Sequence, residues 1–208
     1  MLYLNVPYEQ KDEAKSMYAR WDNNRKKWFA TNSKYYYRLA EWIEGDSVVQ
    51  NSMYIAVSSR KCWKCGKETL VYALAVRSED LIDIVYRETN IEEAIGYDVV
   101  FLPISSNLPK EIKGYLEKHT NCKDKYSHTI QDTYFANICT HCKSLQGDFF
   151  VYEEYDSPFN GMGNSKIKYI EFKLEHDLAI NYQVGEQIIS PSVKKFSEDI
   201  IQSNIVIS

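Results

Sequence analysis

The sequence lacks any segment typical of a membrane or exported protein. No apolar run approaches the roughly 18 to 20 residues that a helix needs to cross a bilayer. The opening residues, MLYLNVPYEQKDEAK, lack the charged and then apolar layout of a signal peptide. We therefore expect a cytoplasmic protein with no membrane partner.

An excess of positive charge is also missing. The 25 lysines and arginines stand against 29 acidic residues, giving a formal net charge of −4. This balance excludes a protein coated in positive charge, so any nucleic-acid site must be a local patch. With 208 residues, 44% of them hydrophobic and 14% aromatic, the chain is long and apolar enough for a folded core.

Signatures of well-known catalytic sites are absent. The sequence contains no GxGxxG, no P-loop, no GxSxG and no HExxH. An unfamiliar enzyme would need a deep pocket lined by residues such as His128, Asp132 or His176. The enzyme question stays open at this point, and the sequence favours a non-enzymatic role.

Cysteines are few, but their spacing is informative. Four of the five form two CxxC pairs, which are Cys62 with Cys65 and Cys139 with Cys142. Two such knuckles supply the four thiolates of a complete tetrahedral zinc site. A site with four cysteines has no open coordination position, so the predicted Zn²⁺ is structural. Gly66 suits the tight turn after the first pair, which needs a positive φ.

Other interpretations of these cysteines remain open. Residues 66–138 separate the pairs by far more than the roughly 15 to 20 residues usual in a zinc ribbon, which implies an insertion. One CxxC alone would fit a thioredoxin-like redox site, and buried cysteines without a metal are a further alternative. His141 is a substitute ligand in principle. A second, partial site would combine His119, Cys122 and His128.

The first 45 residues predict a small domain with the order strand, helix, strand, helix. Alternation at residues 2–5 indicates a strand. An apolar stripe at helical spacing follows, formed by Ala14, Met17, Tyr18 and Trp21. Residues 22–24 predict a turn, residues 27–30 a second strand, and residues 36–43 a second helix that ends at Gly45.

Residues 46–208 predict a larger domain. Apolar runs at 69–76 and 97–104, and alternation at 170–174, indicate strands. Helices are expected from about residue 106 to His119 and around residues 193–200, and an exposed loop is expected at 157–165. The predicted fold is therefore α+β: a small N-terminal strand-helix-strand-helix domain at 1–45 and a zinc-ribbon-centred α/β domain at 46–208.

A basic and aromatic cluster lies in the first domain. Its members are Arg20, Arg25, Lys26, Lys27 and Trp28, with Trp21 close by. Cations of this kind pair with phosphates, and an exposed indole stacks on a base. Trp21 lies on the apolar stripe, which favours a position in the core for this residue. If Trp28 packs beside it, the cations form only a solvated turn.

Two stretches resemble known bacterial sequences. LNVPY (4–8), ARWD (19–22) and KKWF (26–29) resemble an uncharacterised bacterial domain with LNVPY, GARWD-like and KKWY-like motifs. Tyr18 replaces the glycine usual in that domain. The resemblance implies an accessory DNA or RNA contact, because that domain occurs fused to primase-like, topoisomerase-like and other plasmid or phage DNA-processing proteins. YFANICTHC (134–142) with QGDFF (146–150) resembles a motif of hypothetical proteins that carry CWKC upstream, which implies one shared zinc.

Two functional hypotheses follow from these features. The first is a zinc-binding accessory module that contacts DNA or RNA in a plasmid- or phage-type setting, as part of a mobile element. The second is a protein-interaction adaptor or inhibitor that binds a host or phage protein through exposed tyrosines. Steep salt dependence of nucleic-acid binding distinguishes the first from the second.

Overall fold

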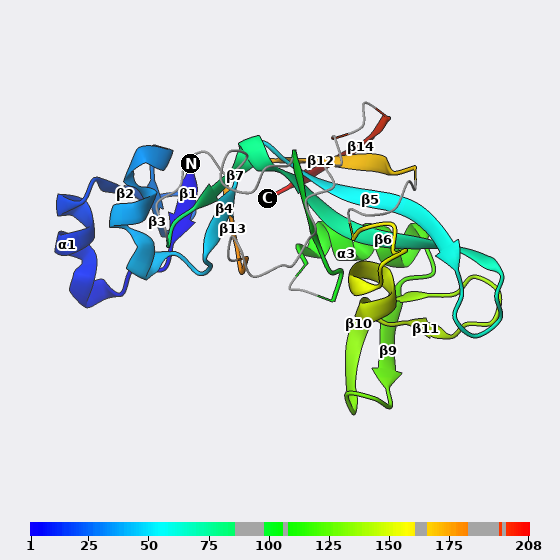
Figure 1. The fold of residues 1–208 in the computed structure, drawn as a ribbon. Coiled ribbons are helices and arrows are strands. Elements are labelled where there is room, and N and C mark those ends of the chain that lie inside the picture. The colour runs from blue at the N-terminus through cyan, green and yellow to red at the C-terminus, as the bar shows by residue number, and fades with distance from the viewer. Residues whose placement is uncertain (86–97, 106–107, 161–165, 183–195, 197–198) are drawn as a thin grey trace.

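The computed structural model describes residues 1–85, 98–105, 108–160, 166–182, 196 and 199–208. Strands dominate these residues, and they form four sheets. The N-terminal residues and the five-stranded sheet lie along one elongated molecule, with the cysteine loops at the end remote from the N-terminus (Figure 1). The predicted α+β class is therefore wrong, because the described residues are mostly β and contain few helices.

The first sheet has the order β1-β3-β2 and is antiparallel throughout. Its strands are β1 (Leu2–Leu4), β2 (Ala19–Asp22) and β3 (Lys27–Ala30). Helix α1 (Lys11–Ser16) spans six residues and connects β1 to β2. Two short 3₁₀ helices, Ser33–Arg38 and Ala40–Trp42, follow β3.

The predicted strand-helix-strand-helix order is wrong in two places. The first helix stops at Ser16 because Tyr18 adopts φ 75°, a left-handed conformation that ends a helix. Trp21 therefore lies in a strand opposite Trp28. The predicted second helix consists of 3₁₀ turns, in which residues three apart share a face; Tyr36, Leu39 and Trp42 are buried in this way.

The main sheet has the order β14-β12-β5-β6-β8. Its strands are β5 (Ser52–Lys61), β6 (Glu68–Arg77), β8 (Val99–Leu102), β12 (Lys168–Leu174) and β14 (Ile200–Ile207). All neighbours are antiparallel except β12 and β14. The strands predicted at 69–76 and 170–174 are confirmed, as is the core of the one at 97–104. The helix predicted around residues 193–200 is wrong at Ile200, which begins β14. Residues 193–195 lie outside the described residues.

Both faces of the main sheet are covered by apolar side chains. Alternate residues of β5 point to opposite sides, so Met53 and Ile55 enter one core while Tyr54 and Ala56 enter the other. Helix α3 (Lys110–His119) contributes to the first of these cores. Its end at His119 confirms the prediction, whereas the predicted helix start at 106–107 lies outside the described residues. Residues buried on both faces explain the nearly continuous apolar runs in the sequence.

Two smaller sheets complete the fold. The order β13-β4-β7 joins β4 (Ser47–Val49), β7 (Leu81–Asp83) and β13 (Leu178–Ile180). The order β11-β10-β9 joins β9 (Lys123–Ser127), β10 (Asp132–Ile138) and β11 (Leu145–Gln146). A 3₁₀ turn at Ser78–Asp80, another at Tyr8–Gln10 and a π-helical turn at Phe149–Glu153 lie between strands.

The core of the N-terminal sheet extends past residue 45. Its buried members include Leu2, Trp28 and Leu39, together with Val48 of β4 and Ile84 after β7. The division at residues 45 and 46 stays a prediction, and this core crosses it. A zinc ribbon at the centre of the second part is wrong, because the cysteines lie in loops at the ends of β5 and β10.

Candidate metal centre and nucleic-acid interface

The two CxxC pairs meet in space, although 73 residues separate them in the sequence. The first pair lies in the loop from β5 to β6, and the second in the loop from β10 to β11. The sulfur atoms of Cys62, Cys65, Cys139 and Cys142 all lie within 4.8 Å of one another. The insertion between the knuckles contains β6, β7, β8, α3, β9 and β10. Strand pairing, not sequence proximity, therefore assembles the site.

Both knuckles have the same backbone geometry. In the first, the Gly66 amide donates to the Cys62 carbonyl at 2.9 Å, and in the second, the Lys143 amide donates to the Cys139 carbonyl at 3.2 Å. Gly66 has φ 67°, as predicted, and Lys143 has φ 59°. One backbone amide in each loop also donates to the first sulfur at 3.4 Å. Each loop thus directs two thiols to the same side.

The sulfur positions fit a tetrahedral metal ion. Cys62 Sγ and Cys142 Sγ are 3.7 Å apart, and Cys65 Sγ and Cys139 Sγ are 3.8 Å apart. A tetrahedron with metal–sulfur bonds of about 2.3 Å has edges of about 3.8 Å. All five cysteines of the chain are free, so no disulfide competes for these sulfurs. The four cysteines therefore form a group that could hold a metal ion.

Polar neighbours adjust the acidity of the thiols. Burial opposes ionisation of Cys62, but hydrogen bonds from Ser144 and from the knuckle backbone lower the pKa of its thiol to about 5. For Cys65, a backbone hydrogen bond from Lys67 favours the thiolate, yet burial and the neighbouring thiols raise its pKa to about 11. Four thiolates this close repel one another, so a bound cation is needed for all of them to ionise.

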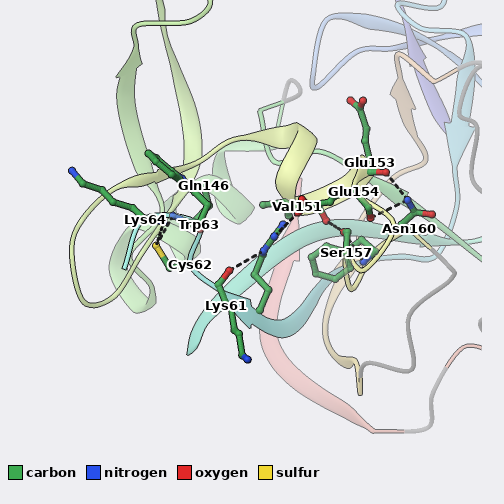
Figure 2. Close-up of polar contacts among 12 residues, drawn as sticks. Lys61, Cys62, Trp63, Lys64, Gln146, Val151, Glu153, Glu154, Ser157 and Asn160 are labelled. Atoms are coloured by element: carbon green, nitrogen blue, oxygen red, sulfur yellow. Dashed lines mark hydrogen bonds and ion pairs between the residues drawn. The ribbon is translucent and has the colours of Figure 1, made fainter. Parts of the chain in front are cut away.

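Two residues that sequence reasoning missed support the sulfurs. The Ser144 hydroxyl lies 3.1 Å from Cys142 Sγ and 3.4 Å from Cys62 Sγ. The buried Gln146 side chain donates from Nε2 to Cys62 Sγ at 3.4 Å, and the side chains near Cys62 are drawn in Figure 2. Such outer contacts orient ligands and tune their affinity for a metal. The QGDFF motif begins at Gln146, but spacing alone gives no reason to connect it with sulfur.

The alternative ligands are not part of this group. His141 is exposed, and its Nε2 lies 2.9 Å from the Glu68 carbonyl oxygen. Cys122 is buried beside Asn137, and burial raises the pKa of its thiol to about 12. His119 and His128 pack against tyrosine rings. Within the described part of the chain, no other group of three or more potential ligands comes together.

The basic and aromatic cluster divides between two faces of the first sheet. Trp28 points into the core and is 8% exposed, and Trp21 packs edge-on against it with 43% exposure. Arg20 and Lys27 alternate with these tryptophans and therefore lie on the opposite, open face. Trp28 is thus a core residue, whereas the sequence analysis places it in the interface.

Two rings share the open face with the cations. Tyr3 of β1 lies opposite Phe29 of β3, and their ring centroids are 6.4 Å apart. The Lys27 ammonium lies 5.9 Å from the Tyr3 ring, and the Arg25 guanidinium lies 5.6 Å from it. Sequence reasoning missed Tyr3 and Phe29, although the alternation of Leu2, Tyr3 and Leu4 already indicates that Tyr3 faces outward.

A cavity of about 530 Å³ borders this face. It is lined by residues of the first sheet and of the segment around β13, among them Tyr3, Arg25, Lys27, His176 and Asp177. Nη2 of Arg25 contacts both carboxylate oxygens of Glu175 at 3.0 Å. Lys26 lies in the β2–β3 turn with φ 54° and is exposed. Arg20, Lys26 and Lys27 have no ion pair among the described residues.

Comparison with known proteins identifies the first segment. Residues 1–44 match the family described as a domain of unknown function, DUF5710. The chain carries a DUF5710 domain at its N-terminus. Part of the chain is also similar to the DNA primase TraC of Escherichia coli, at 44% identity over 43 residues. This match covers 21% of the present chain and 3% of the primase.

No solved structure matches this chain. Within the residues that the structure describes, no helix is both long enough and apolar enough to cross a membrane.

Proposed function

We propose that this protein is a zinc-stabilised accessory module that contacts nucleic acid through the open face of its DUF5710 sheet, in a plasmid- or phage-type DNA-processing setting. The observation that carries the proposal is the shared position of Arg20, Lys27, Tyr3 and Phe29 on one sheet face, where both cations are exposed and both rings are half-buried. Cations bind phosphates, and rings on a sheet surface stack on unpaired bases.

The similarity to a DNA primase supports the same setting. It covers only 3% of that protein, so it bears on the accessory segment and not on primer synthesis. Zinc is the metal we propose for the cysteine group, because four thiolates at tetrahedral spacing are its usual structural site. With all four positions filled by sulfur, the ion stabilises the loops and leaves no site for a reacting water.

Salt dependence tests the proposed contact. We expect single-stranded DNA or RNA to bind the protein with an affinity that falls steeply as salt rises. In the double variant Arg20→Glu, Lys27→Glu, loss of two phosphate contacts lowers the slope of log affinity against log salt by about 1.4, or about 0.7 per contact. The matched control is Lys11→Glu, Lys15→Glu, which changes the charge equally but lies on α1.

If both double variants weaken binding equally, the loss reflects net charge alone. That result would overturn the assignment of nucleic-acid contact to this sheet face. No salt-sensitive binding by the unaltered protein would overturn nucleic-acid contact altogether. That second result favours the adaptor hypothesis, for which exposed side chains such as Tyr8 and Tyr155 are available.

A further inference from the structure

We propose that the knuckle end of the molecule is a second contact for single-stranded nucleic acid, in which Trp63 stacks on an unpaired base. This inference rests on the proposed function, because it assumes that the protein acts on nucleic acid. It concerns a different surface, however, which is formed by the metal-binding loops at 60–67 and 139–147.

Trp63 is exposed and yet held in a fixed position. It lies between two of the cysteines and retains 53% exposure. Its Nε1 donates to the Leu145 carbonyl at 2.8 Å, so the ring is tied to the opposite knuckle. One side of the ring stacks on Phe150 with centroids 6.1 Å apart and an interplanar angle of 14°. A ring held in this way loses little conformational freedom when a base stacks on it.

Phe150 is itself supported. Its ring packs edge-on against Phe149 at 5.7 Å, and the Arg60 guanidinium lies 5.7 Å from its centroid. Arg60 also forms an ion pair with Glu154 at 2.6 Å and is only 11% exposed. Phe150 and Trp63 therefore form a stacking platform, in which the supported Phe150 ring lies below the accessible indole of Trp63.

Exposed lysines lie in the same two loops. Neither loop contains an aspartate or a glutamate between residues 60 and 67 or between 139 and 147. The exposed cations of the two loops are Lys61, Lys64, Lys67 and Lys143. None of these four has an ion pair among the described residues, and in Figure 2 the side chains of Lys61 and Lys64 extend outward from the ribbon.

This local charge contrasts with the net charge of −4 for the whole chain. Four thiolates and a divalent ion carry a formal charge of about −2. The four lysines exceed this charge by about two, and the exposed Glu68 beside Lys67 offsets one of them. A positive surface with one accessible fixed ring is complementary to a single strand, whose phosphates are charged and whose bases are free to stack. A duplex offers phosphates but no free base.

The two surfaces lie at opposite ends of the molecule. Figure 1 shows the DUF5710 sheet beyond the start of β5 and the knuckle loops beyond its end. The ten residues of β5, which lies between the two surfaces, span about 33 Å. A short strand therefore occupies one surface at a time, whereas a long strand reaches both and gains from the high effective concentration of the second site.

The experiment compares Trp63→Ala and Trp63→Phe with the unaltered, metal-loaded protein. Each binds single-stranded DNA of about 4 and of about 40 nucleotides, and duplex DNA of the longer length. We expect Trp63→Ala to weaken binding of the long single strand by about 5- to 150-fold, the range for loss of one stacked base. Trp63→Phe should retain most of the affinity, and duplex binding should change little.

Tyr126→Ala is the matched control, because Tyr126 is 49% exposed on β9, away from the knuckles. Metal content and melting temperature report whether Trp63→Ala stays folded. Lys64→Glu is the second variant if it does not, since its side chain points outward and packs against nothing in the core. Cross-linking of a bromouracil-containing strand to Trp63 would support the proposal directly.

The outcomes separate the two proposals. Loss of single-strand binding in Arg20→Glu, Lys27→Glu, with no change in Trp63→Ala or Lys64→Glu, overturns the second contact and leaves the first. Equal losses for single strand and duplex in Trp63→Ala overturn stacking. Failure of the unaltered protein to bind any strand overturns both.

Discussion

Replacing a cysteine of the metal group should release the metal and unfold the knuckle end. The predicted variants are Cys62→Ser and Cys139→Ser, which remove one ligand from each loop. Serine is a poor zinc ligand at neutral pH because its hydroxyl stays protonated, so three ligands remain. We expect elemental analysis to find one zinc per chain in the unaltered protein and none in either variant.

The size of the expected loss of stability depends on the other contacts that join the two loops. Among the described residues, four hydrogen bonds connect the knuckle regions besides those to sulfur: one joins Trp63 to Leu145, two join Thr140 to Thr69, and one joins His141 to Glu68. At about 1 kcal/mol each they contribute about 4 kcal/mol. A structural zinc contributes about 10–16 kcal/mol at neutral pH. The metal therefore dominates, and its loss should lower the melting temperature sharply.

Cys122→Ala is the control for these variants. This cysteine is 2% exposed and lies outside the metal group. Its replacement leaves a small cavity and lowers stability modestly, but the metal content should stay at one per chain. One zinc per chain in Cys62→Ser, with an unchanged melting temperature, would refute the tetrahedral site.

Two further predictions concern stability. Gly66→Ala should lower the free energy of unfolding by about 1 kcal/mol, because an added Cβ meets no atom within 4 Å and the only cost is the positive φ. Lys143→Gly should raise the free energy of unfolding by about 0.5 kcal/mol, because glycine adopts the positive φ at this position without strain. Chemical denaturation measures both changes. Burial raises the pKa of Asp148, although Ser105 donates to its carboxylate and opposes this shift. The folded state therefore holds that proton more tightly than the unfolded state, and stability falls as pH rises through the folded-state pKa. Asp148→Asn should raise the melting temperature at neutral pH. This gain in melting temperature should disappear at about pH 4.

Contrary results would be informative in each case. Equal effects of Gly66→Ala and Lys143→Gly, both destabilising, would mean that the two knuckles do not share one backbone geometry. An effect of Asp148→Asn that does not change with pH would mean that charge at this position has no part in stability.

The grouping of the four cysteines was predictable because two CxxC pairs indicate one shared site whatever lies between them. The fold was not, since the periodicity of Ala14, Met17, Tyr18 and Trp21 fits a helix as well as it fits a short helix followed by a strand. The residue that decides is Tyr18, whose positive φ ends the helix although its side chain disfavours that conformation. Local patterns do not reveal this, because packing of the hairpin compensates for the strain.

The surface proposed to contact nucleic acid was predictable only in part. Charge clustering located Arg20 and Lys27, but it assigned Trp28 to the same surface. Alternation in a strand places neighbours on opposite faces, so Lys27 and Trp28 cannot share one. Once β3 is known to be a strand, the same rule places Phe29, and not Trp28, on the face that carries Lys27. The contacts of Ser144 and Gln146 with sulfur depend on the approach of β11 to the first knuckle. No short sequence pattern encodes this approach.

The core that crosses residue 45 has a consequence for where the DUF5710 segment of this chain can be cut. Val48 and Ile84 close the apolar side of the sheet here, and both lie outside the 44 matched residues. A fragment ending at residue 45 would expose that side to water. The 44 matched residues are therefore shorter than the core to which they contribute in this chain, and a fragment that includes β4 and β7 should be more stable than one that ends at residue 45.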